Sequence, residues 1–246
     1  MSSPPTPEGI SVSVIVPIYN EIDLLGTAIP EISRFLCESG IEHEIIIIES
    51  GSTDGSAGIC DQLGATVPHV RVIHEGQRNG MGAALRLGYD AARLNLVWLV
   101  TADIPFPLET LSHALPLMRR YDCVLSYRSE DQRGLFRKLQ SLGYNQLVKA
   151  ALGLPMKTVN SAFKLFRREV LQQMELTSTG WFLDAEVLYW VVRRAHTFTE
   201  IPVPLVDRSA GSSKVRRTDI LATLWELVQF KQKTALKSPN VWHHND

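Results

Sequence analysis

Two short apolar stretches, residues 11–17 (SVSVIVP) and 44–49 (EIIIIE), decide the fold class of this chain. Both are rich in β-branched residues and too short for a convincing helix, which is typical of strands buried on both faces. Similar stretches predict strands at 70–74, 96–101 and 122–127. Helical patterns lie between them, at 21–39, 53–63, 80–94 and 108–121. The alternation predicts an α/β fold with a Rossmann-like, mostly parallel central sheet flanked by helices.

The second half of the chain follows a different pattern. Residues 135–152 and 184–196 predict helices, and residues 199–206 predict a short strand. Residues 218–232 (TDILATLWELVQFKQ) have the spacing of an amphipathic helix, with Thr218 as its N-cap. Packing in the core is the commoner arrangement for its apolar stripe of Leu221, Leu224, Trp225 and Val228, and contact with a bilayer surface is the alternative. We predict a tail at 1–10, one compact domain at 11–215, and a C-terminal amphipathic helix and tail at 216–246.

The composition excludes several classes of protein. With 246 residues, 45% of them hydrophobic and 21% charged, the chain can fold around a sizeable core. A formal net charge of −1 argues against nucleic acid as a partner. The three cysteines lie far apart, so neither a disulfide framework nor a zinc site is indicated. No apolar run reaches the roughly 18 residues of a membrane-spanning helix, and we expect a cytoplasmic protein that reaches a membrane only from its surface.

Polar residues follow the first four predicted strands, at the edge where parallel sheets bind ligands. Residues 17–21 (PIYNE) follow the first strand and 49–56 (ESGSTDGS) the second, although turns and helix caps also explain both. Residues 78–82 (RNGMG) follow the third strand, and a glycine-rich helix start beside an arginine suits a phosphate. The full dinucleotide fingerprint is missing there, which disfavours an NAD-dependent oxidoreductase. Asp103 follows the fourth strand and suits a hard cation, with a turn or helix cap as the alternative.

In this order the segments resemble the family 2 glycosyltransferases of GT-A fold, especially dolichyl-phosphate mannose synthase and the bacterial polyprenyl-phosphate glycosyltransferases. Residues 16–21 are similar to the family's VPxYNE segment, 49–56 to DDGSTDGT, 78–83 to NRGKGA, and Asp103 to the last acid of DxD. Residues 122–128 (DCVLSYR) are similar to DxVxGSR, 152–154 with 161–163 (LGL, SAF) to LGL and SGF, and 208–214 (RSAGSSK) to RxxGxSK. The order of these matches makes the resemblance specific.

The resemblance implies an inverting transfer of a hexose from a UDP- or GDP-linked sugar to a polyprenyl phosphate or a saccharide. It implies that the donor nucleotide contacts Pro17, Tyr19, Glu21, Glu49, Ser50, Arg78, Asn79, Gly80 and Ala102. Asp103 would hold Mg²⁺ or Mn²⁺, while Arg128, Arg208 and Lys214 would neutralise phosphate groups.

The acceptor decides whether a general base is needed. A lipid phosphate at a membrane surface is already ionised near neutral pH and requires none. A hydroxyl acceptor requires a base within hydrogen-bonding reach, and Asp184 is the candidate. The helix dipole also explains an acid in the first turn of a helix, which is the favoured interpretation for Glu186.

The sequence departs from the family pattern at two acidic positions. Ser50 stands where the family has the second Asp of DDGS, a contact to the nucleotide base, and Thr101 stands where DxD begins. A hydroxyl forms hydrogen bonds without the charge of a carboxylate. Because Mg²⁺ is commonly held by one or two carboxylates together with substrate phosphates, we expect Asp103 with a nucleoside diphosphate to hold the metal, with weaker affinity, in an active enzyme. The alternative is a degenerate family member that binds a sugar nucleotide or acts as a scaffold.

Overall fold

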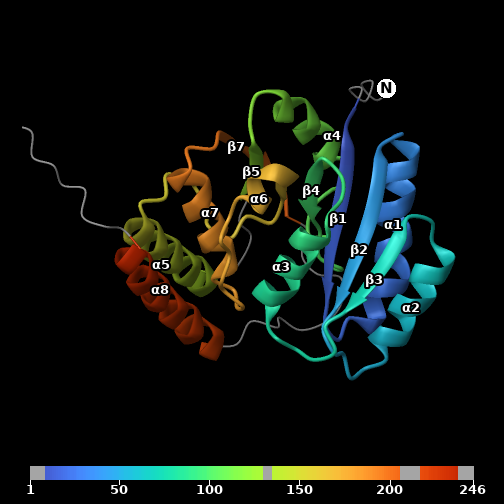
Figure 1. The fold of residues 1–246 in the computed structure, drawn as a ribbon, viewed down its shortest axis with the longest axis horizontal. Coiled ribbons are helices and arrows are strands. Elements are labelled where there is room, and N and C mark those ends of the chain that lie inside the picture. Colours follow the sequence, from blue (N-terminus) through green and yellow to red (C-terminus); the bar gives the residue numbers. More distant parts are fainter. Residues whose placement is uncertain (1–8, 130–134, 206–216, 238–246) are drawn as a thin grey trace, which may run out of the picture.

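Within the described residues, seven strands form one sheet in the order β3-β2-β1-β4-β6-β5-β7 (Figure 1). The computed structural model describes residues 9–129, 135–205 and 217–237, and their side chains except at 135–140, 217–221 and 235–237. The strands are β1 (Ser11–Ile18), β2 (Glu42–Glu49), β3 (Val70–His74), β4 (Leu96–Leu99), β5 (Cys123–Arg128), β6 (Lys164–Arg167) and β7 (Phe198–Val203). Only β6 runs against its neighbours, β4 and β5. The predicted mostly parallel α/β sheet is confirmed.

The middle strands β1, β2 and β4 contain long apolar stretches because alternate side chains enter two different cores. In β1, Val14 belongs to the core on one face and Ile15 to the core on the other. The first face is covered by α1 (Ile22–Glu38), α2 (Ser56–Thr66) and α4 (Thr110–Ala114). The second face is covered by α3 (Met81–Ala91), α6 (Arg168–Gln172) and α7 (Leu183–Arg193). Because helices cover both faces of the sheet, we expect a binding site at one of the two ends of the strands.

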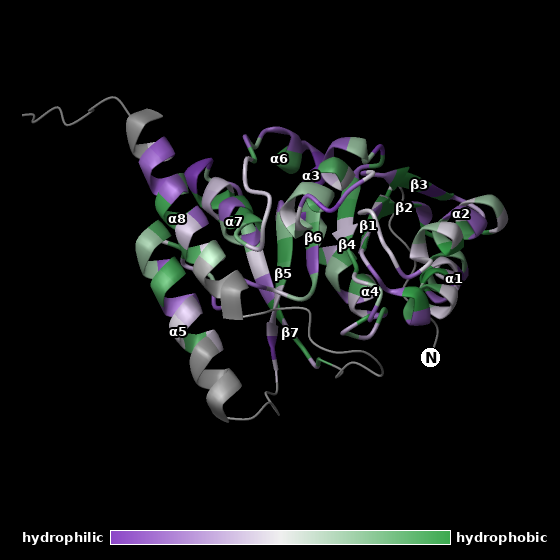
Figure 2. Ribbon diagram, turned by 90° about the horizontal axis from the view of Figure 1, so that it is seen from below, coloured by the Kyte–Doolittle hydropathy of each residue, from purple (hydrophilic) through white to green (hydrophobic). Residues whose placement is uncertain are grey.

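Two further helices, α5 (Leu135–Leu152) and α8 (Arg217–Lys237), lie side by side beyond α7 (Figures 1 and 2). The Phe230 ring of α8 packs 4.9 Å from that of Tyr189, centroid to centroid. Trp225 is 63% exposed and Val228 46%, so the prediction that they pack in the core is wrong. Thr218 lies within α8, so its predicted role as the N-cap is also wrong. Among the described residues, no helix is long and apolar enough to cross a membrane.

Three of the differences from the predicted elements have local reasons. The pair β6 and α6 was not predicted, because four strand residues are too few to show a period. The predicted helix at 108–121 becomes α4 and a 3₁₀ helix, η1 (Leu115–Arg119), where Pro116 lacks the amide N–H that would continue α4. The predicted helix at 80–94 ends at Ala91, because the next backbone amides donate to side chains of the sheet instead.

Candidate active site

The loops after β1 and β2 form one hydrogen-bonded unit at the carboxyl edge of the sheet. Asn20 adopts a left-handed φ of 52°, which Asn tolerates better than most residues. Its backbone N–H donates to Ser52 Oγ at 3.0 Å, and its Oδ1 accepts from the Thr53 N–H at 2.8 Å. Asp54 accepts from the N–H of Ile22 at 3.1 Å, at the start of α1. Much of the polar stretch at 49–56 therefore holds the two loops together.

Glu49 is buried and faces this unit. Its carboxylate accepts from the Ser52 N–H at 2.6 Å and lies 2.9 Å from His74 Nδ1, while His74 Nε2 lies 2.9 Å from Asp61. Burial opposes ionisation of Glu49, but the hydrogen bonds from Ser52 and His74 outweigh it and lower the pKa of Glu49. The two carboxylates in turn raise the pKa of His74. The charge of Glu49 thus stabilises the loops.

Ser50 faces a cavity and is paired with an acid that the sequence analysis did not single out. Ser50 Oγ donates to Glu75 Oε2 at 2.5 Å. Asn79 Nδ2 donates to the other carboxylate oxygen of Glu75 at 3.4 Å. Glu75 follows β3 in a polar loop, where nothing in the sequence marks it off from a solvated acid. The structure therefore places a carboxylate behind the serine that replaces the family's second Asp.

Gly80 precedes α3 and closes the cavity against the loop at 177–182. Its φ is 103°, and a Cβ there would lie 2.3 Å from the carbonyl oxygen of Thr179. The Ala83 N–H donates to the same oxygen at 3.1 Å. Glycine is required at this position for both reasons.

Asp103 emerges after β4 with its carboxylate held by the residue that replaces the first acid of DxD. Thr101 Oγ1 donates to Asp103 Oδ1 at 2.5 Å. The threonine thus orients the single carboxylate of that motif.

These loops surround a cavity of about 270 Å³ at the carboxyl edge, which we call the donor cavity because the resemblance implies that residues lining it contact the donor. Eight of the predicted residues line it: Pro17, Tyr19, Glu21, Ser50, Arg78, Gly80, Ala102 and Asp103. The remaining lining residues are Ile18, Met81, Ala84, Thr101 and Trp181. The guanidinium of Arg78 lies over the Tyr19 ring, 4.2 Å from its centroid. Segments that are far apart in sequence converge because the carboxyl ends of parallel strands meet at one edge.

The other predicted residues lie elsewhere. Glu49 and Asn79 stand outside the lining of the donor cavity and contact residues behind it. Arg128 ends β5, which β6 separates from β4. Arg208 and Lys214 lie outside the described residues.

A second cavity of about 290 Å³ adjoins the first and shares Met81, Thr101 and Trp181 with it. We call it the acceptor cavity, a label for the place where the acceptor proposed below would bind. Its other walls are mainly apolar and come from β4, β6, α3, α5, α7 and α8 and their loops: Leu85, Leu99, Pro105, Tyr144, Asn160, Ser161, Ala162, Lys164, Gly180, Leu183, Asp184 and Thr223.

One ion pair lies in the acceptor cavity. Lys164 Nζ donates to Asp184 Oδ2 at 2.8 Å, and the exposed fractions of the two side chains are 9% and 17%. Lys164 begins β6, which places it beside Leu99 at the carboxyl edge. Lys164 was not predicted as a site residue, although a lysine inside the apolar run 163–166 (FKLF) is an unusual signal.

Two further carboxylates hold the loop that carries Trp181. Glu186 is fully buried and accepts from the N–H groups of Thr177 and Ser178, each at 2.8 Å, which fits the structural interpretation of this residue. Glu226 of α8 accepts from the Gly180 N–H at 2.9 Å. The wall between the two cavities is therefore fixed partly from the C-terminal helix.

The residues of the donor cavity fit a hard cation only in combination with a ligand. Asp103 and Thr101 offer oxygen atoms, which are the ligands that Mg²⁺ and Mn²⁺ prefer. Within the described part of the chain, no group of three or more His, Cys, Asp or Glu side chains gathers as a metal site. A cation at Asp103 would take its remaining ligands from phosphate groups and water.

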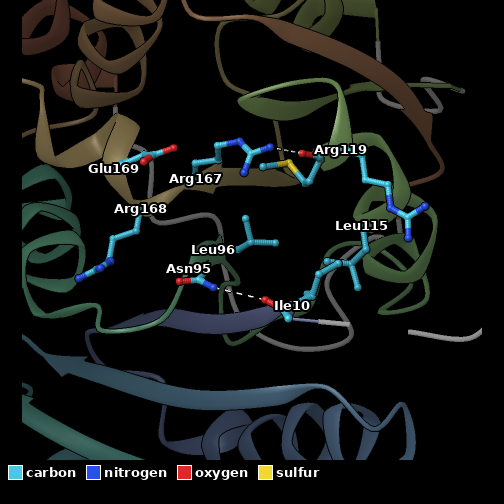
Figure 3. Close-up of a pocket in the computed structure, with 10 residues that line it drawn as sticks. Ile10, Asn95, Leu96, Leu115, Arg119, Arg167, Arg168 and Glu169 are labelled. Carbon is cyan, nitrogen blue, oxygen red and sulfur yellow. Dashed lines mark hydrogen bonds between the residues drawn. The ribbon is translucent and has the colours of Figure 1, made fainter. Parts of the chain in front are cut away.

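The opposite edge of the sheet has a cavity of a different kind, of about 360 Å³ (Figure 3). Arg167 donates to the carbonyl oxygen of Met118, and Asn95 Nδ2 donates to that of Gly9 at 3.3 Å. The side chains of Arg119 and Arg168 point away from one another (Figure 3). The charged groups here do not converge on a ligand.

Comparison with known proteins identifies the family. The family model of glycosyl transferase family 2 matches residues 13–174. The chain belongs to glycosyl transferase family 2. The predicted class of enzyme, a nucleotide-sugar-dependent glycosyltransferase, is thereby confirmed.

Two curated relatives align with most of this family 2 glycosyltransferase. It is 26% identical over 228 residues to the undecaprenyl-phosphate 4-deoxy-4-formamido-L-arabinose transferase of Klebsiella pneumoniae, covering 92% of this chain and 69% of the relative. It is 27% identical over 242 residues to glycosyltransferase AglD of Haloferax volcanii, covering 90% of this chain and 38% of AglD. The chain thus spans about two thirds of the first relative and well under half of the second.

Solved structures show the GT-A fold of this family 2 glycosyltransferase. Mannosyl-3-phosphoglycerate synthase from Rubrobacter xylanophilus matches with a TM-score of 0.70 and 18% identity, over 97% of this chain and 79% of that one. Glucosyl-3-phosphoglycerate synthase from Mycobacterium tuberculosis, solved with Mn²⁺, UDP and glucosyl-3-phosphoglycerate, matches with a TM-score of 0.68 and 22% identity, over 95% and 82%. At these identities the likeness concerns the fold alone.

Proposed function

We propose that this enzyme transfers a hexose, with inversion, from a UDP- or GDP-linked sugar to a polyprenyl phosphate. The observation that carries the proposal is the pair of adjoining cavities at the carboxyl edge, which share the wall made by Met81, Thr101 and Trp181. One cavity is lined by the segments that resemble the family's donor site. The other is mainly apolar and holds a lysine. A sugar at the shared wall would meet both substrates.

The donor cavity suits a nucleoside diphosphate. Arg78 supplies a positive charge, and its stacking on Tyr19 fixes the guanidinium plane. Asp103, oriented by Thr101, would hold Mg²⁺ or Mn²⁺ against the diphosphate. When bound, such a cation neutralises the charge that develops on the departing nucleoside diphosphate.

The acceptor cavity suits the phosphate end of an isoprenoid. Leu85, Tyr144 and Leu183 offer apolar surface for the first isoprene units, and Lys164, whose ammonium group is shared with Asp184, offers a cation for the phosphate. A phosphate oxygen would form the new bond to the anomeric carbon as the bond to the nucleoside diphosphate breaks with its electron pair. No proton moves, so this reaction needs no general base. The Klebsiella relative, by its name, also acts on undecaprenyl phosphate.

A saccharide acceptor is the second candidate, because Asp184 lines the same cavity. A hydroxyl nucleophile must lose its proton, and Asp184 is the carboxylate within that cavity. Of the two candidate acceptors, only the polyprenyl phosphate would require the enzyme to contact a membrane surface.

The test is a transfer assay with a panel of UDP- and GDP-sugars in the presence of Mg²⁺ or Mn²⁺. Short-chain polyprenyl phosphates, saccharides and 3-phosphoglycerate serve as competing acceptors. We expect transfer to the polyprenyl phosphate with inverted anomeric configuration. Transfer to a saccharide alone selects the second candidate. Binding of a sugar nucleotide without turnover on any acceptor contradicts both and indicates the degenerate family member.

The Asp103→Asn variant tests the predicted metal ligand in the same assay. Because the amide lacks the negative charge, we expect the variant to lose most of its metal-stimulated activity. Glu109→Gln, at an exposed acid on the neighbouring segment, is the matched control. Unchanged activity and an unchanged metal response in the Asp103 variant would show that Asp103 holds no metal.

A further inference from the structure

Ser50 lines the donor cavity where the family resemblance places the nucleotide base. A serine hydroxyl has one proton to donate and two lone pairs to accept with. By itself it therefore does not distinguish a ligand group that donates a hydrogen bond from one that accepts. The groups around Ser50 decide whether its hydroxyl donates a hydrogen bond to a ligand in the cavity or accepts one from it.

Glu75 accepts the hydrogen bond that the Ser50 hydroxyl donates. The hydroxyl donates to Glu75 Oε2 at 2.5 Å. The position of Glu75 is fixed by its backbone N–H, which donates to the carbonyl oxygen of Glu49 at 2.8 Å. Its second carboxylate oxygen accepts from Asn79 Nδ2 at 3.4 Å, and Gln77 Nε2 donates to Asn79 Oδ1 at 3.2 Å. A short chain of hydrogen bonds thus orients the carboxylate toward Ser50.

The other acid beside Ser50 is directed elsewhere. The carboxylate of Glu49 accepts from the Ser52 N–H and contacts His74, and Glu49 is only 2% exposed. Glu75 is therefore the carboxylate that sets the hydrogen-bonding direction of Ser50. Because the hydroxyl proton of Ser50 points at Glu75 in this hydrogen bond, Ser50 offers its oxygen lone pairs to the cavity.

We propose that Glu75 acts through Ser50 as a positioning residue for base recognition. The pair selects a nucleoside diphosphate whose base presents a ring N–H, as uracil and guanine do. It disfavours a base that presents a bare ring nitrogen at the corresponding place, as cytosine and adenine do. This inference rests on the proposed function, because it takes the nucleotide of the donor to lie in the donor cavity. The pair restores the acceptor that was lost when Ser50 replaced the family's Asp.

Two matched pairs of nucleotides measure how much the ring N–H of the base contributes to binding. UDP and CDP share a pyrimidine frame, and GDP and ADP share a purine frame. Dissociation constants for all four are measured by titration calorimetry with the full chain and Mg²⁺. We expect the wild-type protein to bind UDP more tightly than CDP, or GDP more tightly than ADP, by about tenfold, the value of one net hydrogen bond.

The variants then separate the role of Glu75 from a general effect on folding. Glu75→Gln places an amide beside Ser50 that is able to donate, so we expect the preference to fall to about threefold or less. Ser50→Ala should lose the preference with Glu75 intact. Adding Ser50→Asp to Glu75→Gln supplies a carboxylate directly and should restore the preference. Glu31→Gln, at an exposed acid on α1, is the matched control and should keep the wild-type ratios.

The outcomes distinguish this inference from the proposed function. If the UDP:CDP and GDP:ADP ratios of dissociation constants are the same in the wild-type, Glu75→Gln and Ser50→Ala proteins, Glu75 has no role in base recognition. The assignment of the nucleotide to the donor cavity is unaffected by that result. Failure of all four nucleotides to bind the wild-type protein overturns the donor cavity, and this inference with it.

Discussion

At the scale of single residues, His74 at the end of β3 links Glu49, at the end of β2, to Asp61 of α2. Hydrogen bonds to Glu49 and Asp61 raise its pKa. The folded protein therefore binds the proton of His74 more tightly than the unfolded chain does. The resulting stabilisation is complete below the ordinary pKa of about 6.5 and is lost as pH rises through the raised value.

We expect His74→Gln to remove this pH dependence. Urea unfolding from mildly acidic to mildly alkaline pH should show the advantage of the wild-type protein over the variant shrinking as pH rises. His113→Gln, at an exposed histidine of α4, should leave the wild-type profile unchanged. If the unfolding free energies of the His74 variant and the wild-type protein changed with pH in parallel, His74 would not contribute the expected pH-dependent stabilisation.

The pair of Lys164 and Asp184 supports a second prediction at this scale. Removing one partner of a buried ion pair leaves the other charge uncompensated and costs about 3–5 kcal/mol of unfolding free energy. Lys164→Met should show a loss of this order, and the double variant Lys164→Met/Asp184→Leu should recover much of it while remaining inactive. Lys231→Met on α8 is the exposed control. A double variant as unstable as the sum of the two single variants would contradict the coupling.

The sequence predicted well which residues after the strands line the donor cavity. It did not predict the site residues that depend on a side-chain contact with another loop. Tyr19, Ser50, Arg78 and Asp103 line one cavity because the carboxyl ends of parallel strands must meet. The partnership of Ser50 with Glu75 depends on a side-chain contact between two loops, which no local pattern encodes.

At the scale of elements, α8 contributes to the site from a distance. Glu226 accepts hydrogen bonds from the backbone N–H groups of Gly180 and Phe182, at 2.9 and 3.4 Å, on either side of Trp181. We expect Glu226→Ala to leave these amides without their acceptor, at a cost of about 1–3 kcal/mol. Hydrogen exchange of residues 177–182 should accelerate.

Gln229→Ala, at an exposed position on the same helix, is the matched control for Glu226→Ala. If exchange at 177–182 were equal in the two variants, α8 would have no part in holding the loop.

The elements that were predicted least well lie in the second half of the chain. Lys164 was missed because its strand, β6, has four residues and runs against its neighbours, so neither length nor βαβ alternation revealed it. The stripe of α8 was misassigned because, among the side chains of α8 that the structure describes, Thr223, Leu227 and Phe230 are buried while Trp225 is exposed. Only the packing of α8 against α7 distinguishes the two faces.

At the scale of the whole molecule, the sheet separates two kinds of cavity. The carboxyl edge holds the donor and acceptor cavities, where charged and polar groups from several loops converge. The opposite edge holds a cavity whose arginines are engaged by the backbone or diverge (Figure 3). We therefore expect the nucleotide of the donor to bind at the carboxyl edge.

Hydrogen–deuterium exchange of the full chain with and without UDP or GDP and Mg²⁺ tests this claim most directly. We predict slower exchange in peptides that cover residues 17–21, 78–84 and 101–103, which line the donor cavity, and unchanged exchange around Arg167–Glu169. Protection confined to the opposite edge, or no protection by either nucleotide, would contradict the assignment of the donor site.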